Sequence, residues 1–414
     1  MNKHFIHPTF GKCQLVPDHL AIQWKQTQKK EKIHSILEAY SLKLASQTPK
    51  QPEIEDKENK KEKLKDIRDP RTGSINQAGT LTWATTEKEN LKELFDELNA
   101  DPNIEWASPA YRATAAEDSP QSWFTINPTV LLLSNESQNT LTEILTLDPS
   151  IYLNETRARI LHGFIALNLP NSNAIEIAEK LTTGTPILEN IPYISPLTCS
   201  NGSACSNDSD CGSSCTESDD DCSPSLQSLI PDDTFFPNQW GLERIKAPQA
   251  WPLSQGNPNI VIAVLDQGVE LAHPDLNLWP ISYSTITHTN DGSPVGNHGT
   301  ACAGIISAHT NNTLGVAGLA GECRVMAIST FFSDVQVAEG LYYAADNGAK
   351  VVSMSFGVYP SWMIWNFAII EAALQYCHEK GVVLVAASGN ENIATSRFPG
   401  SDPRTICVGG TNRD

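Results

Sequence analysis

The feature that most constrains the fold is a set of four uninterrupted apolar runs in the C-terminal half. They are rich in β-branched residues and lie at Ile260–Leu265, Val325–Ile328, Val351–Ser355 and Val382–Ala387. A strand without polar alternation is buried on both faces, as in a parallel sheet covered by helices. Helical patterns separate the runs, over His298–Ser307, Val335–Asn347 and Trp365–Lys380. We therefore predict a doubly wound α/β domain with a mostly parallel sheet over residues 234–414.

The N-terminal half has a different pattern, in which short alternating strands and amphipathic helices follow one another twice. Residues 1–120 read as strand, helix, one or two strands, helix, strand, and one helix is expected over Ile33–Leu44. Residues 121–198 repeat that order, with a strand pair expected at Thr156–Leu161 and Gly163–Leu169. We predict two small α+β modules of split βαβ, ferredoxin-like topology.

Residues 199–233 separate the two halves and are rich in Ser, Asp, Asn and Cys, without any Lys or Arg. Such a segment cannot bury a core, so we predict a linker where a precursor would expose its cleavage site. Half of the ten cysteines fall here, at Cys199, Cys205, Cys211, Cys215 and Cys222. We expect disulfides rather than a zinc site, because the paired Cys-x-x-Cys spacing is missing.

Charge and hydropathy exclude several classes of partner. The formal net charge of −19 should repel nucleic acid and anionic membrane surfaces. The chain contains no apolar run of about 18 residues, so we expect no membrane span. Residues Met1–Pro8 lack the apolar core of a secretion signal, whereas the cysteine cluster favours a secreted, extracellular protein.

Three polar residues stand where the predicted strands and helices meet. Asp266 directly follows Ile260–Leu265, His298 opens a predicted helix, and Asn390 comes just after Val382–Ala387. Each has an ordinary explanation by itself, as a turn Asp, a helix-end His and a loop Asn. Function in doubly wound folds collects at the carboxyl ends of the strands, so the three together favour a functional site.

The residues around these positions resemble the motifs of the subtilisin-like serine protease family. Ile262–Val269 is similar to the family's aspartate motif, and His298–Gly304 is similar to its histidine motif, His-Gly-Thr-x-x-Ala-Gly. Ala387–Asn390 resembles the oxyanion segment, and Ser353–Gly357 resembles the strand that binds substrate backbone. The resemblance runs continuously from Asp232 to Asp414.

The resemblance implies an endopeptidase that hydrolyses polypeptide substrates through an Asp-His-Ser triad. Asp266 would orient His298, which would accept the serine proton, and Asn390 would donate a hydrogen bond to the oxyanion. Cys302, one helical turn past His298, is expected to have a packing role. Substrate backbone would be bound by Ser355, Phe356, Gly357, Ser388 and Gly389.

The resemblance also implies a structural calcium site. Asp275 would supply a carboxylate and Asn312 a side-chain oxygen, while Leu314 and Val316 would supply backbone carbonyls. Asp233 is a further candidate. Ligation by oxygen alone suits calcium. The alternative is an ordinary Asn-rich turn after a helix.

The front modules fit the family pattern of an α+β propeptide that assists folding and caps the active site. Asn103–Pro109 resembles the last strand of such propeptides. We therefore expect residues 1–120 to act as an intramolecular inhibitor. Residues 121–198 are either a duplicated propeptide or an unrelated spacer.

The family's serine motif, Gly-Thr-Ser-x-Ala-x-Pro, does not occur in the sequence. Only 24 residues follow Asn390, and their two serines, Ser396 and Ser401, lack the Gly-Thr context. We expect a protease precursor truncated before its serine motif and inactive by itself. Two alternatives stay open: a non-catalytic homologue with a binding or regulatory role, and a free inhibitor whose front modules are the working part.

Overall fold

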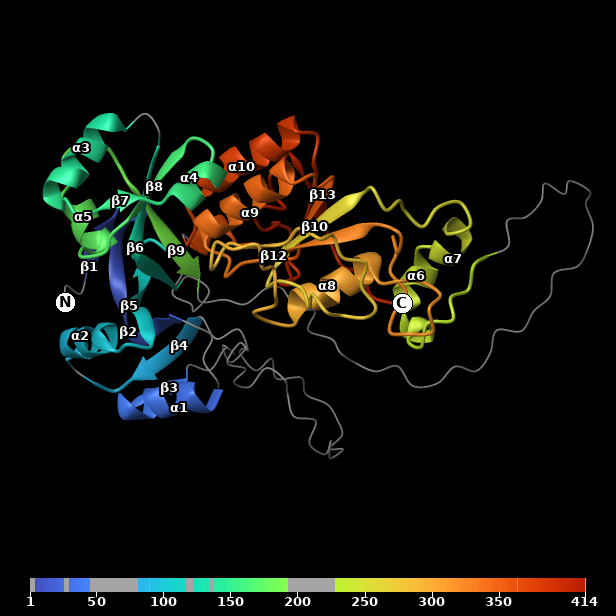
Figure 1. Cartoon of the computed structure of the whole chain (residues 1–414), viewed down its shortest axis with the longest axis horizontal. Coiled ribbons are helices and arrows are strands. Elements are labelled where there is room, and N and C mark those ends of the chain that lie inside the picture. Colours follow the sequence, from blue (N-terminus) through green and yellow to red (C-terminus); the bar gives the residue numbers. More distant parts are fainter. Residues whose placement is uncertain are drawn as a thin grey trace, which may run out of the picture.

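The computed structural model describes residues 4–25, 30–44, 81–88, 90–116, 123–134, 137–192, 228–362 and 364–413. They form a nine-stranded sheet from the N-terminal half and a six-stranded sheet from the C-terminal half, which lie side by side (Figure 1). The cysteines from Cys199 to Cys222, for which disulfides are predicted, lie outside the described residues. Within the described ranges, no helix is long and apolar enough to cross a bilayer.

The C-terminal domain, residues 228–413, is built on the parallel sheet that the apolar runs predict. Its strand order is β11-β12-β10-β13-β14-β15, and all neighbours are parallel. The strands are β10 (Val261–Asp266), β11 (Tyr283–Ser284), β12 (Arg324–Ser329), β13 (Val351–Met354), β14 (Val383–Ala387) and β15 (Thr405–Val408). The predicted α/β class and all four predicted strands are confirmed.

Helices cover both faces of β10, so its side chains are buried whichever way they point. Ala263 and Leu265 join the core that contains α9 (Asp334–Asp346) and α10 (Phe367–Glu379), whereas Val264 joins the core under α8 (His298–Ser307). The short helices are η2 (Phe236–Asn238), α6 (Trp240–Arg244), α7 (Ala247–Ala250) and η3 (Pro360–Trp362).

Burial on both faces does not extend to the edge of this sheet. Val383 of β14 is 45% exposed, and Ile406 and Val408 of β15 are 56% and 49% exposed. Helices cover only one side of β14. Its Leu384 and Ala386 pack in the core with α10, while no described helix covers the opposite side. The prediction of a fully buried strand at Val382–Ala387 is therefore wrong for one face.

The N-terminal half forms a single antiparallel sheet of two similar parts. The first module, described within residues 4–116, contains β1 (His4–His7), β2 (Gly11–Trp24), α1 (Lys30–Ala39), β3 (Leu42–Leu44), β4 (Leu81–Thr86), α2 (Leu91–Ala100) and β5 (Ile104–Ala113). The second module, described within residues 123–192, contains β6 (Phe124–Ser134), α3 (Gln138–Leu147), β7 (Tyr152–Leu153), α4 (Glu155–Ile160), β8 (Phe164–Asn168), α5 (Ala174–Lys180) and β9 (Ile187–Pro192).

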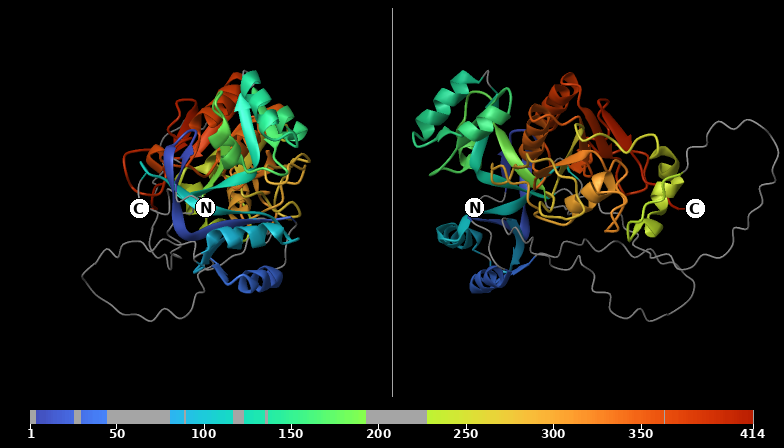
Figure 2. Two further views of the ribbon diagram at one scale, coloured as in Figure 1. Left: turned by 90° about the vertical axis from the view of Figure 1, so that its left-hand side faces the viewer. Right: turned by 45° about the vertical axis from the view of Figure 1, so that its right-hand side comes forward.

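The strand orders of the two modules are alike. They are β3-β4-β2-β5 in the first module and β7-β8-β6-β9 in the second. The modules join where Tyr111 of β5 pairs with Phe124 of β6. Figure 2 shows the second module lying against α9 and α10, which separate it from the parallel sheet.

Two predicted elements of the front half are wrong. Thr156–Leu161 forms the helix α4 instead of a strand, because the side chain of Asn154 accepts a hydrogen bond from the Arg157 backbone N–H and caps its first turn. The predicted helix over Ile33–Leu44 ends at Ala39. Ser41 has a positive φ of 59°, which stops the helix and turns the chain into β3.

We expect Gly340→Ala to destabilise the C-terminal domain. A Cβ at this position of α9 would lie 2.5 Å from Leu265 Cδ1 and 3.3 Å from Ile328 Cγ2, and both of these side chains are fully buried. Overpacking of this kind costs about 1–3 kcal/mol, which thermal unfolding would show as a lower Tm. Gly241→Ala is the matched control, because a Cβ there meets nothing within 4 Å. Equal Tm values for the two variants would contradict the close packing of α9.

Candidate active site

The centre of the site is a buried carboxylate paired with a partly exposed imidazole. Asp266 is the last residue of β10, and His298 is the first residue of α8. The Nδ1 atom of His298 lies 2.9 Å from both carboxylate oxygens of Asp266. The Asp266 side chain is 1% exposed, whereas that of His298 is 14% exposed. The structure thus brings together two of the predicted catalytic residues.

Two glycines allow α8 to begin so close to the end of β10. A Cβ at Gly299 would lie 2.2 Å from the backbone oxygen of Gly268, so only glycine fits there. Gly268 itself has a φ of 80° and lies against the backbone of Ser293. Larger residues at either position would push the helix, and His298 with it, away from Asp266.

The electrostatics of the pair favour a charged imidazole. Burial disfavours the imidazolium, but hydrogen bonds with Asp266 and Cys302 outweigh it and hold the pKa of His298 well above its usual range. The pKa of His298 is higher in the folded chain than in the unfolded chain. The Asp266–His298 pair therefore contributes its full stabilisation of the fold at pH values below the unfolded pKa. It is lost as pH rises through the folded pKa.

Cys302 connects the imidazole with the predicted substrate-binding strand. Its Sγ lies 3.8 Å from His298 Nδ1 and donates a 3.4 Å hydrogen bond to Ser355 Oγ. The potential ligand atoms of Asp266, His298 and Cys302 all lie within 4.8 Å of one another, so this group could also hold a metal ion. The structure therefore gives Cys302 a polar contact beyond the packing role expected of it.

The predicted substrate-binding residues lie at one edge of the sheet. Ser355–Gly357 follows β13, and Ser388–Asn390 follows β14, whose Ala386 pairs with Met354 of β13. Gly389 has a φ of 124°, a conformation that side chains rarely adopt, and it turns the chain toward Asn390. The backbone N–H of Asn390 donates to the Glu391 carboxylate at 2.9 Å.

Arg397 joins these two segments, and the sequence analysis missed it. Its Nη1 donates to the Gly357 carbonyl, and its backbone N–H donates to the Ser388 carbonyl, both at 2.9 Å. The guanidinium pairs with Glu391 and lies 4.6 Å from the centroid of the Trp362 ring. The sequence gives little indication of this role, because the aromatic residues near Trp362 that the guanidinium contacts are far from Arg397 along the chain.

The predicted calcium residues also converge. The side-chain amide of Asn312 donates to Asp275 Oδ1 at 2.8 Å, and the Val316 N–H donates to Asp275 Oδ2 at 3.2 Å. The same loop reaches Asp233, whose Oδ2 accepts from the Asn311 N–H at 2.7 Å. Asp233 Oδ1 is buried and has no hydrogen-bond partner among the described residues. Two buried carboxylates, one with an unmatched oxygen, fit a hard cation such as calcium.

The fold and this site define a class: a parallel α/β domain whose strand ends carry a buried Asp-His pair. Comparison with known proteins agrees with that class. Residues 257–414 match the subtilase family. Thermitase of Thermoactinomyces vulgaris is 37% identical over 192 residues, which cover 44% of this chain and 66% of thermitase. The thermophilic serine proteinase of Bacillus sp. (strain AK1) is 35% identical over 192 residues, 44% of this chain and 46% of the relative.

The C-terminal domain therefore belongs to the subtilase family, and the resemblance to subtilisin-like serine proteases is confirmed. The chain spans about half to two thirds of the length of these relatives. Among solved structures, fervidolysin from Fervidobacterium pennivorans, a keratinolytic enzyme related to subtilisin, matches with a TM-score of 0.47 and 20% identity. That match covers 68% of this chain and 43% of fervidolysin.

We expect Asp266→Asn to lower the pKa of His298 from its raised value to its ordinary value or below. The substitution removes the charge that favours the imidazolium and leaves the burial that disfavours it. An NMR titration of the His298 ring would measure the change. Asp291→Asn is the control, because Asp291 is exposed and its carboxylate is bound by the Ser293 N–H. A pKa of His298 that moves equally in both variants would contradict a direct role of Asp266.

Proposed function

We propose that the C-terminal domain is the acid and base part of a serine endopeptidase. The observation that carries this proposal is the buried Asp266 carboxylate on Nδ1 of a partly exposed His298. Such a pair orients the imidazole so that Nε2 can take the proton of a serine hydroxyl. The subtilase membership of residues 257–414 supports it independently.

In the proposed reaction, His298 acts from its neutral form, which its raised pKa favours only at alkaline pH, and removes the serine proton as the serine oxygen attacks the substrate carbonyl. It then gives this proton to the amine that leaves, while the Asp266 carboxylate stabilises the imidazolium. The side-chain amide of Asn390 donates to the oxyanion, an interaction worth about 3–4 kcal/mol. Extended substrate would hydrogen-bond to the backbone of Ser355, Phe356, Gly357, Ser388 and Gly389.

The nucleophile is the one member of the triad for which we propose no residue among the 414. Ser396 and Ser401 both lie outside helices, whereas the family's serine opens one. Ser396 Oγ accepts a hydrogen bond from Cys407. We therefore assign neither serine to the triad, and we propose that residues 1–414 supply the front modules and the Asp-His pair.

We propose a structural calcium ion bound by Asp275, Asn312 and the carbonyl oxygens of Leu314 and Val316. Asp233 would be a further ligand, because its unmatched buried oxygen needs a partner. The ion would neutralise the two carboxylates and hold the loop after α8 in place. Its role would be stability, since calcium supplies no chemistry to the Asp-His pair.

The proposed setting is extracellular, and the proposed substrates are polypeptides. One relative in the family is named the minor extracellular protease Epr of Bacillus subtilis (strain 168). We propose the domain boundaries that the sequence predicts, at residues 1–120, 121–198, 199–233 and 234–414. The front modules would act as an intramolecular inhibitor of the domain they cover.

The proposed activity is tested by extending the coding sequence beyond Asp414 and expressing the longer chain. We expect a Gly-Thr-Ser motif and cleavage of a chromogenic peptide. His298→Ala should lower kcat/KM by roughly 10⁴-fold or more, because it removes the proton acceptor. His378→Ala is the control, since His378 is exposed on α10. Peptidase activity that survives His298→Ala, or an extended chain without the serine motif, would contradict the proposal.

The calcium proposal has a readout that needs no activity. Removing calcium with a chelator should lower the Tm of the 414-residue chain by about 5–10 °C, because an ion that binds only the folded state stabilises it. Asp275→Asn should abolish this difference, and Asp291→Asn should preserve it. A Tm that is the same with chelator and with added calcium would show that the loop is an ordinary turn.

A further inference from the structure

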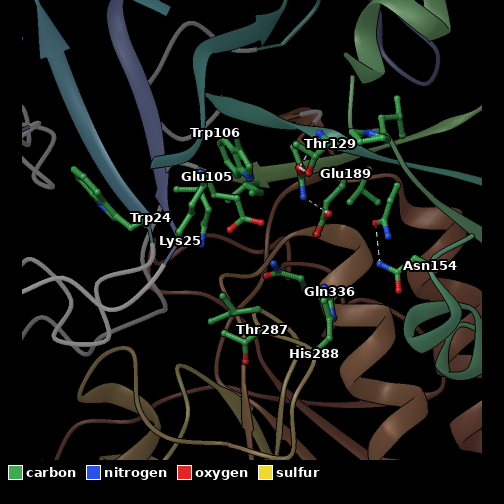
Figure 3. Close-up of a pocket in the computed structure, with 18 of the residues that line it drawn as sticks. Trp24, Lys25, Glu105, Trp106, Thr129, Asn154, Glu189, Thr287, His288 and Gln336 are labelled. Carbon is green, nitrogen blue, oxygen red and sulfur yellow. Dashed lines mark hydrogen bonds between the residues drawn. The ribbon is translucent and has the colours of Figure 1, made fainter. Parts of the chain in front are cut away.

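The two front modules contact the C-terminal domain in chemically different ways. The first module contributes Ala21 and Trp106 to a small apolar cluster with Val295 and Phe331, which Ile191 of the second module also joins. Beside this cluster lies a cavity of about 900 Å³, lined by all three parts of the structure. Figure 3 shows Lys25 and Glu105 of the first module facing this cavity, with Thr287 and His288 of the C-terminal domain on its other side. The first module therefore contacts the C-terminal domain through a small apolar cluster, and the cavity beside this cluster interrupts the packing between them.

The second module instead makes a buried charged contact with α9. Arg157 of α4 is 1% exposed, and its Nε donates to Glu339 Oε2 at 3.1 Å. Its two other nitrogens donate to Glu189 of β9 at 3.0 and 3.2 Å. The second oxygen of Glu339 accepts from Tyr283 and bonds to His288 Nδ1. One cation of the second module is thus shared between a carboxylate of its own and one of the C-terminal domain.

Polar groups of the second module also contact the acidic residues at both ends of α9. At the N-terminal end, the backbone and side chain of Asn190 donate to the buried Asp334 carboxylate at 3.2 and 3.0 Å. At the C-terminal end, His162 Nε2 lies 2.8 Å from Asp346, and the His162 ring stacks on Tyr376. Each of these three acidic residues of α9 therefore meets a polar group of the second module.

Burial makes the Arg157 contact selective. Taking two carboxylates and a guanidinium out of water is costly, and the arrangement is tolerable only when all three are present. If Arg157 were absent, Glu189 and Glu339 would face each other as buried like charges. Any protein that covers α9 in the same way must bring a cation to the position of Arg157.

We propose that the second module is the docking partner of the C-terminal domain, with Arg157 as its anchor on α9. The first module is then held mainly through the sheet that joins β5 to β6. The association of the front half with the C-terminal domain should then depend on Arg157 when the linker between them is cut. This inference rests on the contacts alone and does not require the proposed peptidase activity.

The test uses the full 414-residue chain with the recognition sequence of a site-specific protease inserted in residues 199–227. After cutting, the wild-type fragments should elute together on gel filtration. Arg157→Met should weaken their association at least about tenfold, because it leaves Glu189 without its arginine partner and Glu339 with His288 as its remaining basic partner. Arg159→Met is the matched control, since Arg159 lies on the same helix, exposed, and pairs only with Glu155 among the contacts described.

Two further variants keep the test decisive. Glu339→Gln removes the charge on the C-terminal side of the same contact. The double variant Arg157→Met, Glu339→Gln should lose less affinity than the sum of the losses in the two single variants. Trp106→Ala removes the largest side chain that the first module contributes to the apolar cluster and should have the smaller effect. Circular dichroism of each uncut chain checks folding. Fragments that stay together in both Arg157→Met and Glu339→Gln but separate in Trp106→Ala would overturn the proposal in favour of the first module.

Discussion

The parallel register of β10 between β12 and β13 is the constraint on which the site depends. Because all three strands run the same way, their carboxyl ends meet at one edge of the sheet. Asp266 at the end of β10 and Ser355 after β13 therefore come near one another without any local sequence signal. The glycine at position 299 then lets α8 deliver His298 to the same edge.

The face of the same sheet that carries α9 and α10 determines how the rest of the chain is arranged. With α8 on the opposite face, the outer surfaces of α9 and α10 are left for the second module. An acidic helix there adds to the electrostatic repulsion within a chain of net charge −19, unless a partner supplies cations and hydrogen-bond donors. Arg157 and Asn190 supply them, so the fold of the parallel sheet and the docking of the front half are linked through one helix.

The sequence predicted elements well where burial is uniform and poorly where it is not. The runs of β10, β12 and β13 are covered on both sides, so hydropathy alone found them. The same reasoning found β14 but misjudged its burial, because cover there is one-sided. It failed at α4, where Arg157 and Arg159 alternate with Ala158 and Ile160 like a strand. In α4 the Asn154 cap and the burial of a charged side chain override the alternation. A buried arginine looks like an exposed one in any hydropathy pattern.

The sequence by itself determined the α/β class, the subtilase resemblance and the identity of the Asp266 and His298 pair, because strand burial and short motifs are encoded in neighbouring residues. Only the tertiary structure decided which front module holds the C-terminal domain. It also decided that Arg397 joins the two segments predicted to bind substrate and that Cys302 contacts both His298 and Ser355. Each of these facts includes a contact between residues far apart in the chain, by 40 positions for Arg397 and Gly357, 53 for Cys302 and Ser355 and 182 for Arg157 and Glu339. No local pattern carries that information, because the energy of a buried ion pair depends on its surroundings and not on its position along the chain.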